Sequence, residues 1–130
     1  MKKSPRQRIV KRLDGLLREV IRLRDEDTCQ KCGKKVYGSN SQPSHVIPKS
    51  QSLLLRWNLW NVKLLCNACH RWWHLNPLDS AFWFRQTWPV RNLLLQEHKH
   101  NIGRSWKMSD FEKVEAELKQ KLEDLKGKRL

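Results

Sequence analysis

The N-terminal part of the chain alternates apolar and polar positions with the period of an α-helix. Five apolar residues follow one another at spacings of four and three: Ile9, Leu13, Leu16, Val20 and Leu23. Residues at these spacings share one helix face. Ser4 is a good capping residue, and Pro5 suits the first helical turn. The pattern predicts an amphipathic helix that begins after Ser4 and runs to about Asp25.

The same period returns near the C-terminus. Its apolar positions are Phe111, Val114, Leu118, Leu122 and Leu125. Ser109 and Glu112 have the spacing of a capping box, and Gly127 suits a helix end. We expect a second amphipathic helix here, with an apolar face that could also pair two copies of the chain as a homodimer.

The middle of the chain mixes short extended and helical patterns. Residues 33–44 are rich in Gly, Ser and Asn and predict a loop. The run HVIP, which ends at Pro48, and the run NVKLL, residues 61–65, predict two short strands. Helical spacing follows from residue 66, and two further helices are expected after Asn76-Pro77 and after Trp88-Pro89, the second ending near His98. Phe82 and Trp83 are candidates for the core.

These elements predict an α+β fold that is mostly helical, within one compact domain. We expect a basic N-terminal helix over residues 1–27, a central unit over 28–98 and a C-terminal helical segment over 99–130. At 130 residues the chain has the usual size of one domain.

The net charge of the chain indicates which class of partner it binds. Lys and Arg number 27 against 13 Asp and Glu, a net charge of +14. Residues 1–24 hold nine basic residues against Asp14 and Glu19, a surplus of seven. Such an excess favours polyanions, nucleic acid first and anionic membrane second, although a solvated helix face is the simpler reading. No apolar run is long enough to span a bilayer and no secretory signal is visible, so we expect a cytoplasmic protein.

Two Cys-x-x-Cys pairs, Cys29 with Cys32 and Cys66 with Cys69, are separated by 33 intervening residues. Two such pairs supply the four sulfurs that close a tetrahedral zinc site, and a closed site is structural. Disulfides or four unrelated buried cysteines are the alternatives, but a reducing compartment favours the metal.

Three further residues, combined with these cysteines, resemble the HNH endonuclease family with its ββα-metal core. They are His45 in HVIP, Asn61 in NVKLLC and His70 in CNACH. The resemblance covers about residues 28–75. The part beyond it, with its NPL run and long terminal helix, is loosely similar to phage recombination nucleases of the NinG type.

The resemblance implies a one-metal hydrolysis of a phosphodiester bond. His45 would be the general base, with Asn61 orienting it or reaching the metal. His70 and His74 lie four apart, so they project from one helix face as a pair of metal ligands. The family usually has a metal-ligating Asp or His before the base; this chain has Ser44 there, which is the third candidate ligand beside His70 and His74. A hydroxyl is a poor ligand for Mg²⁺, whereas imidazoles suit Zn²⁺, Ni²⁺ or Mn²⁺.

Several cations near the motif are candidates for contacting DNA phosphates. Arg56 and Arg71 flank it, and Lys49 and Lys63 lie close by in the sequence. The sequence therefore predicts a zinc-stabilised, metal-dependent endonuclease that nicks or cleaves DNA with little sequence preference. A catalytically inactive zinc module that only binds nucleic acid, and a structural subunit that docks through its last helix, are the alternatives.

Overall fold

The computed structural model describes residues 2–99 and 105–128. Its elements follow one another as α1 (Pro5–Arg24), η1 (Gly38–Asn40), β1 (Gln42–His45), α2 (Leu53–Arg56), η2 (Leu59–Asn61), β2 (Val62–Leu65), α3 (Asn67–Leu75), α4 (Pro77–Thr87), α5 (Pro89–His98) and α6 (Met108–Lys128). The fold is α+β and mostly helical, as the sequence predicted. None of the described helices is long and apolar enough to cross a membrane.

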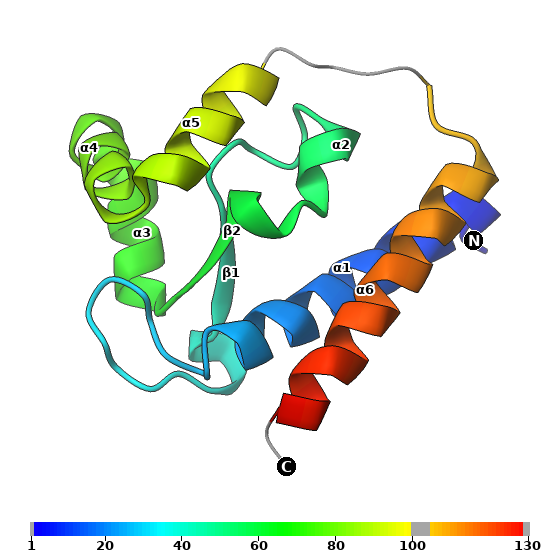
Figure 1. Cartoon of the computed structure of the whole chain (residues 1–130), viewed down its shortest axis with the longest axis horizontal. Helices are drawn as coiled ribbons and strands as arrows, with labels where there is room; N and C mark the ends of the chain where they lie inside the picture. Colours follow the sequence, from blue (N-terminus) through cyan, green and yellow to red (C-terminus); the bar gives the residue numbers. More distant parts are fainter. Residues whose placement is uncertain (1, 100–104, 129–130) are drawn as a thin grey trace.

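Helix α1 forms one long side of the molecule and packs along α6 (Figure 1). Its start is the predicted one, because the Gln7 amide donates to the Ser4 hydroxyl at 3.1 Å and the Ser4 amide donates to the Gln7 side chain at 2.8 Å. The two donors at the helix start are thereby satisfied. The chain turns sharply after α1, where Glu26 and Asp27 adopt positive φ angles of 55° and 49°.

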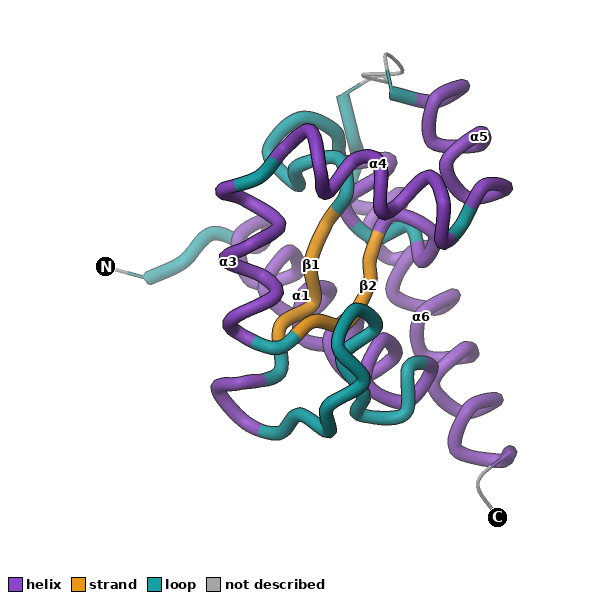
Figure 2. Tube along the Cα trace, turned by 90° about the vertical axis from the view of Figure 1, so that its left-hand side faces the viewer, coloured by secondary structure: helices purple, strands orange, loops and turns teal. Residues whose placement is uncertain are grey.

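The main core lies between α1, α6 and the two-stranded sheet. The apolar face of α1 is buried in it, together with Phe111 and Leu118 of α6 and with Val62 and Leu64 of β2. Figure 2 shows the two strands between α1 and α3. The sheet is therefore held by a long helix on one side and a short one on the other.

The sheet is an antiparallel pair in which Ser44 lies opposite Lys63 and His45 lies opposite Val62. Its first strand starts at Gln42, so the predictions of a loop through residue 44 and of a strand beginning at His45 were wrong by three residues. The amide of Val46 still bonds to the carbonyl of Asn61 at 2.8 Å, and the chain then leaves the sheet. The second strand, Val62–Leu65, begins one residue later than predicted and ends where the sequence predicted.

Helices α3, α4 and α5 enclose a second, smaller core of Leu55, Phe84 and Leu95. The two predicted breaks are confirmed, because α4 begins at Pro77 and α5 begins at Pro89. Phe82 was wrongly expected in the core: it is 56% exposed, and Phe84, two residues on, is buried instead. Trp83 is partly buried against both clusters, as expected for a core residue.

Both ends of α6 differ from the prediction. The helix begins at Met108, and the Lys107 amide donates to the carboxylate of Asp110 at 2.7 Å, so Asp110 closes the first turn in place of Glu112. The helix continues through Gly127 to Lys128. Because glycine is only about 1 kcal/mol worse than alanine inside a helix, one glycine does not end it.

Candidate metal centre and histidine cleft

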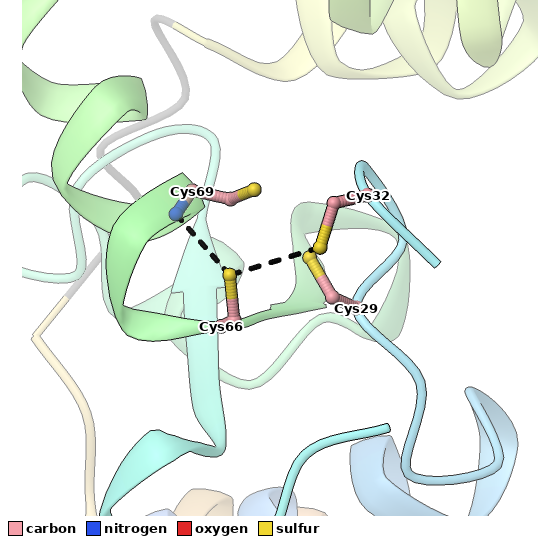
Figure 3. Close-up of side chains that lie close together, drawn as sticks. All are labelled: Cys29, Cys32, Cys66 and Cys69. Carbon is pink, nitrogen blue, oxygen red and sulfur yellow. Dashed lines mark hydrogen bonds between the residues drawn. The ribbon is translucent and has the colours of Figure 1, made fainter. Parts of the chain in front are cut away.

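The four cysteine sulfurs converge on one point (Figure 3), and all lie within 4.8 Å of one another. The sulfurs of Cys32 and Cys66 are 3.9 Å apart. Two ligands of a tetrahedral zinc with 2.3 Å bonds lie about 3.8 Å apart, so the spacing fits the ion. All four cysteines are free of disulfides. The predicted four-sulfur site is therefore present in the fold, and the disulfide alternative is not.

Local backbone structure prepares this site. Gly33 has a φ of 78°, which allows its amide to turn back to the Cys29 carbonyl at 2.9 Å. The amide of Gln30 donates to the Leu64 carbonyl at 2.9 Å and so ties the loop to β2. Cys66 caps α3, and its sulfur accepts the Cys69 amide at 3.3 Å. The site thus joins the loop after α1 to the start of α3.

The thiols are poised to ionise unequally. Burial opposes the Cys29 thiolate, but backbone N–H groups around it outweigh burial and lower the pKa of Cys29 to about 7. Burial and the neighbouring sulfurs raise the pKa of Cys69 well above its ordinary value. Four thiolates in this space consequently need a cation between them, a charge that a zinc ion would supply.

The three candidate histidines line one cleft. His45, His70 and His74 share a cavity of about 490 Å³ that lies between α1, β1 and α3. The rings of His70 and His74 stand at right angles with their centroids 4.6 Å apart, as their spacing on α3 predicted. The sequence features that suggested a common site are therefore brought together in space.

His45 is held in a single orientation at the edge of this cleft. Its Nε2 lies 2.8 Å from the carbonyl oxygen of Arg56. A carbonyl only accepts, so Nε2 carries the proton and Nδ1 keeps its lone pair. Burial lowers the pKa of His45, outweighing the bond to Arg56, and Lys49 lowers it further. The neutral form, which can accept a proton, consequently prevails near neutral pH.

His70 offers an unused nitrogen to the same cleft. Its Nδ1 is buried, and no hydrogen-bond partner for it occurs in the described residues. Burial lowers the pKa of His70, and so do the neighbouring charges of His74 and Lys63. Two imidazole rings side by side can both ligate a divalent cation. Over residues 2–99 and 105–128, however, only the four cysteines form a group of three or more His, Cys, Asp or Glu ligands, so the histidine pair is an incomplete shell.

Residues 29–74 match the family model of the HNH endonucleases. The match covers about a third of the chain and contains the four cysteines and the three histidines of the cleft. No curated protein and no solved structure matches the chain, and the loose similarity to NinG-type nucleases therefore has no support from them. We call this segment the HNH domain after the family model that it matches; α1 and the helices from α4 onward lie outside it.

In this HNH domain Asn61 lies at the end of η2, one residue before β2, and not on the strand. Its side-chain oxygen accepts the Ile47 amide at 2.8 Å, and its nitrogen donates to the carbonyls of Ile47 and Leu55 at 2.9 and 3.0 Å. The Leu55 carbonyl directly precedes the Arg56 carbonyl that holds His45. Asn61 therefore reaches His45 through the backbone, and its side chain is fully used by the loop.

The contact between Ser44 on β1 and Lys63 on β2 corrects the roles expected for both residues. Ser44, expected as a metal ligand, is buried and accepts a hydrogen bond from Lys63 Nζ at 3.0 Å. Lys63, expected to touch DNA phosphate, is 0% exposed, and its Nζ lies 3.4 Å from the centre of the Trp73 ring. The two side chains point to the same face because they lie opposite each other in the sheet.

Arg56 was expected to clamp phosphate and is instead paired within the protein. Its guanidinium donates to both carboxylate oxygens of Asp14 on α1, at 3.1 and 2.7 Å. Trp57 donates to the same carboxylate at 2.9 Å. Lys49 is exposed and lines the cleft, and Arg71 is exposed on α3, so both stay candidates for phosphate contact.

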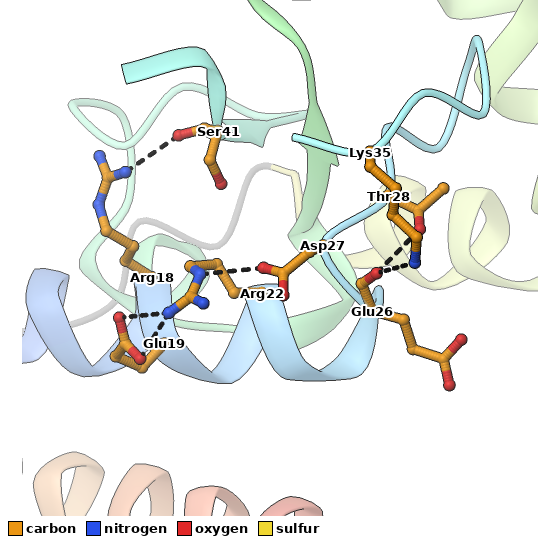
Figure 4. A network of polar contacts seen from close by, with 8 residues as sticks. All are labelled: Arg18, Glu19, Arg22, Glu26, Asp27, Thr28, Lys35 and Ser41. Atoms are coloured by element: carbon orange, nitrogen blue, oxygen red, sulfur yellow. Dashed lines mark hydrogen bonds and ion pairs between the residues drawn. The ribbon is translucent and has the colours of Figure 1, made fainter. Parts of the chain in front are cut away.

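Sequence reasoning missed that α1 forms a wall of the cleft. Asp14, Gly15 and Arg18 line it beside His45, although they lie outside the HNH domain. The Arg18 guanidinium donates to the Ser41 carbonyl at 3.0 Å (Figure 4) and so anchors α1 beside the start of β1. The helical pattern predicted that Asp14, Gly15 and Arg18 lie on the polar face of this helix. No feature of the sequence indicated that this face lies beside the histidines.

Proposed function

We propose that the chain is a metal-dependent HNH endonuclease that hydrolyses DNA phosphodiester bonds with little sequence preference. The observation that supports it best is the cleft shared by His45, His70 and His74, in which the Arg56 carbonyl orients His45 and the rings of His70 and His74 lie side by side. The matched family is one of endonucleases.

In this proposal His45 accepts the proton of the attacking water. Its Nε2–H stays on the Arg56 carbonyl, so Nδ1 is the atom that takes the proton. His70 and His74 would hold a divalent ion, which supplies positive charge to the phosphate oxygens as the bond breaks. Imidazole ligands favour Mn²⁺, Ni²⁺ or Zn²⁺ over Mg²⁺. Asn61 positions the base by fixing the loop that carries the Arg56 carbonyl.

The experiment is a nicking assay on supercoiled plasmid with Mn²⁺, Mg²⁺ or Ni²⁺, and with no added metal. His45→Ala should lose at least ~100-fold in rate, because general-base catalysis contributes about that much. His98→Ala is the matched control, since His98 ends α5 and does not line the cleft. Unchanged nicking by His45→Ala, with circular dichroism showing the same fold, would remove His45 from this role.

A second candidate function is supported by Ser44. Its hydroxyl is occupied by Lys63, so the position before the base gives the ion no ligand. A domain with two imidazoles alone would then retain nucleic acid without cutting it. Plasmid retention in a gel without nicking under any of the three metals would favour this zinc-stabilised binding module.

A further inference from the structure

The solvent-facing side of α1 carries a line of cations that ends in the histidine cleft. Arg8, Lys11, Gly15 and Arg18 follow at spacings of three, four and three, and all four are exposed. These spacings place them on one helix face. The opposite face is the buried one that packs against α6 and the sheet.

At its N-terminal end this face gathers positive charge. An open surface hollow of about 500 Å³ is lined, among the described residues, by Lys3, Arg8, Lys11 and Arg12. Arg12 is paired with Glu115 of α6 at 3.0 Å, whereas Arg8 donates to the Lys3 carbonyl at 2.7 Å. Lys11 lies so close to Lys3 that it lowers the pKa of Lys3. Like charges gathered in this way favour a bound anion.

At its other end the face opens into the cleft, where Gly15 and Arg18 lie on the wall beside His45. The two carboxylates nearest this line on α1 are already neutralised. Asp14 is held by Arg56 at 2.7 Å, and Glu19 is held by Arg22 at 2.8 Å (Figure 4). A negatively charged ligand therefore meets no free carboxylate of α1 along this path.

Neither the backbone conformation nor the packing around position 15 requires glycine. It lies inside a helix, where glycine costs about 1 kcal/mol relative to alanine. Its φ is not positive, and a Cβ built on it would meet nothing within 4 Å. The space above Gly15 is thus empty of protein, at the point where the cationic line enters the cleft. A missing side chain is useful where the backbone of a ligand comes close.

We propose that this face of α1 is a phosphate track that leads one strand of duplex DNA into the histidine cleft, with Gly15 giving the strand its clearance. From Arg8 to Arg18 the helix rises about 15 Å, which corresponds to roughly four base pairs of DNA. The proposal rests on the proposed nuclease function and adds the residues outside the HNH domain that deliver the substrate.

An anionic membrane surface is the other polyanion that a basic helix can meet. A helix that lies on a membrane inserts its apolar face between the lipids. The apolar face of α1 is buried against α6 and the sheet, and none of the exposed large apolar side chains of the described residues lies on α1. The geometry therefore favours nucleic acid.

The test measures binding of a fluorescein-labelled 20-base-pair DNA duplex by anisotropy between 50 and 200 mM NaCl. All proteins carry His45→Ala so that the probe stays intact. The track variant is Arg8→Gln with Lys11→Gln. The control, Lys113→Gln with Lys119→Gln, removes the same charge from exposed positions of α6. Each lost phosphate contact lowers the salt slope by about 0.9, so the track variant should lose about 1.8 and the control almost nothing.

Equal losses in the two variants would overturn the track, because net charge alone would then explain the binding. Absence of duplex binding by the starting protein would overturn it too. An RNA duplex of the same sequence that binds as tightly, with the same loss, would overturn the assignment to DNA. If the chain without His45→Ala never nicks plasmid, while the slopes still differ as expected, the proposed nuclease fails and the track stands.

Discussion

The buried amine of Lys63 can be tested by measuring the stability of two variants. One is Lys63→Met, and the other is the double variant Ser44→Ala with Lys63→Met. The amino group is buried, and burial lowers the pKa of Lys63 well below 10.5, with Arg91 lowering it further. Contact with the Trp73 ring opposes this shift, since an aromatic face attracts an ammonium by about 2 kcal/mol. Loss of hydration on full burial is the larger effect, so the net shift of the Lys63 pKa is downward.

The expected magnitudes follow from the contacts of Lys63. Methionine keeps the length of the side chain and gains about 0.3–1.5 kcal/mol from sulfur against Trp73. The single variant leaves the Ser44 hydroxyl without its 3.0 Å donor, at a cost of about 1–3 kcal/mol. The cost is the larger of the two, so on these contributions the single variant is less stable than the natural chain by about 1 kcal/mol. The double variant removes both polar groups, and we expect it to be more stable than the natural chain by about 1–3 kcal/mol.

Urea unfolding followed by tryptophan fluorescence, at several pH values from 7 to 10, measures both effects. The unfolded chain binds a proton at Lys63 up to about pH 10.5, whereas the folded chain releases it at lower pH. The natural chain therefore gains stability as pH rises through this range, and the advantage of the double variant shrinks. A double variant that is less stable by 2 kcal/mol or more, or a difference that does not change with pH, would refute the buried amine.

Three further outcomes are expected. Cys29→Ser should lose its zinc, measured by elemental analysis, and unfold, because a structural zinc contributes on the order of 10 kcal/mol; a folded variant without zinc would contradict the site. Gly15→Ala should raise the free energy of unfolding by about 0.5–1 kcal/mol, since its Cβ has free space, and a lower melting temperature would show a clash. In nicking assays the acid limb of kcat/KM should lie below pH 6.5, because burial lowers the pKa of His45 and only the neutral ring accepts a proton; a limb above pH 7 would contradict this reading.

The sequence predicted those features that depend on spacing along the chain. The start of α1, the four-sulfur cluster and the pairing of His70 with His74 all follow from fixed residue intervals, and all occur in the structure. The first residue of β1 was harder to predict from the sequence. The strand is only four residues long and contains Pro43, and proline is typical of loops. The HNH domain was recognisable for the same reason as the cysteines, since its motif is a set of intervals.

The side of an element on which a residue lies, and what meets it there, could not be read from the sequence. Lys63 and Arg56 looked like phosphate contacts because cations near a nuclease motif are usually exposed. The register of the sheet turns Lys63 toward Trp73, and α1 brings Asp14 against Arg56. Asp14 is 42 residues away in the chain, and its carboxylate also holds Trp57.

That long-range contact gives α1 a structural part in the candidate site. By pairing with Asp14, the Arg56 side chain fixes the residue whose own carbonyl oxygen fixes His45. The same pairing removes the negative charge that would repel a phosphate arriving along Arg8, Lys11 and Arg18. A helix outside the matched segment thus supports both the orientation of the proposed base and the path of the proposed substrate, so residues 29–74 without α1 would hold the motif but not the cleft.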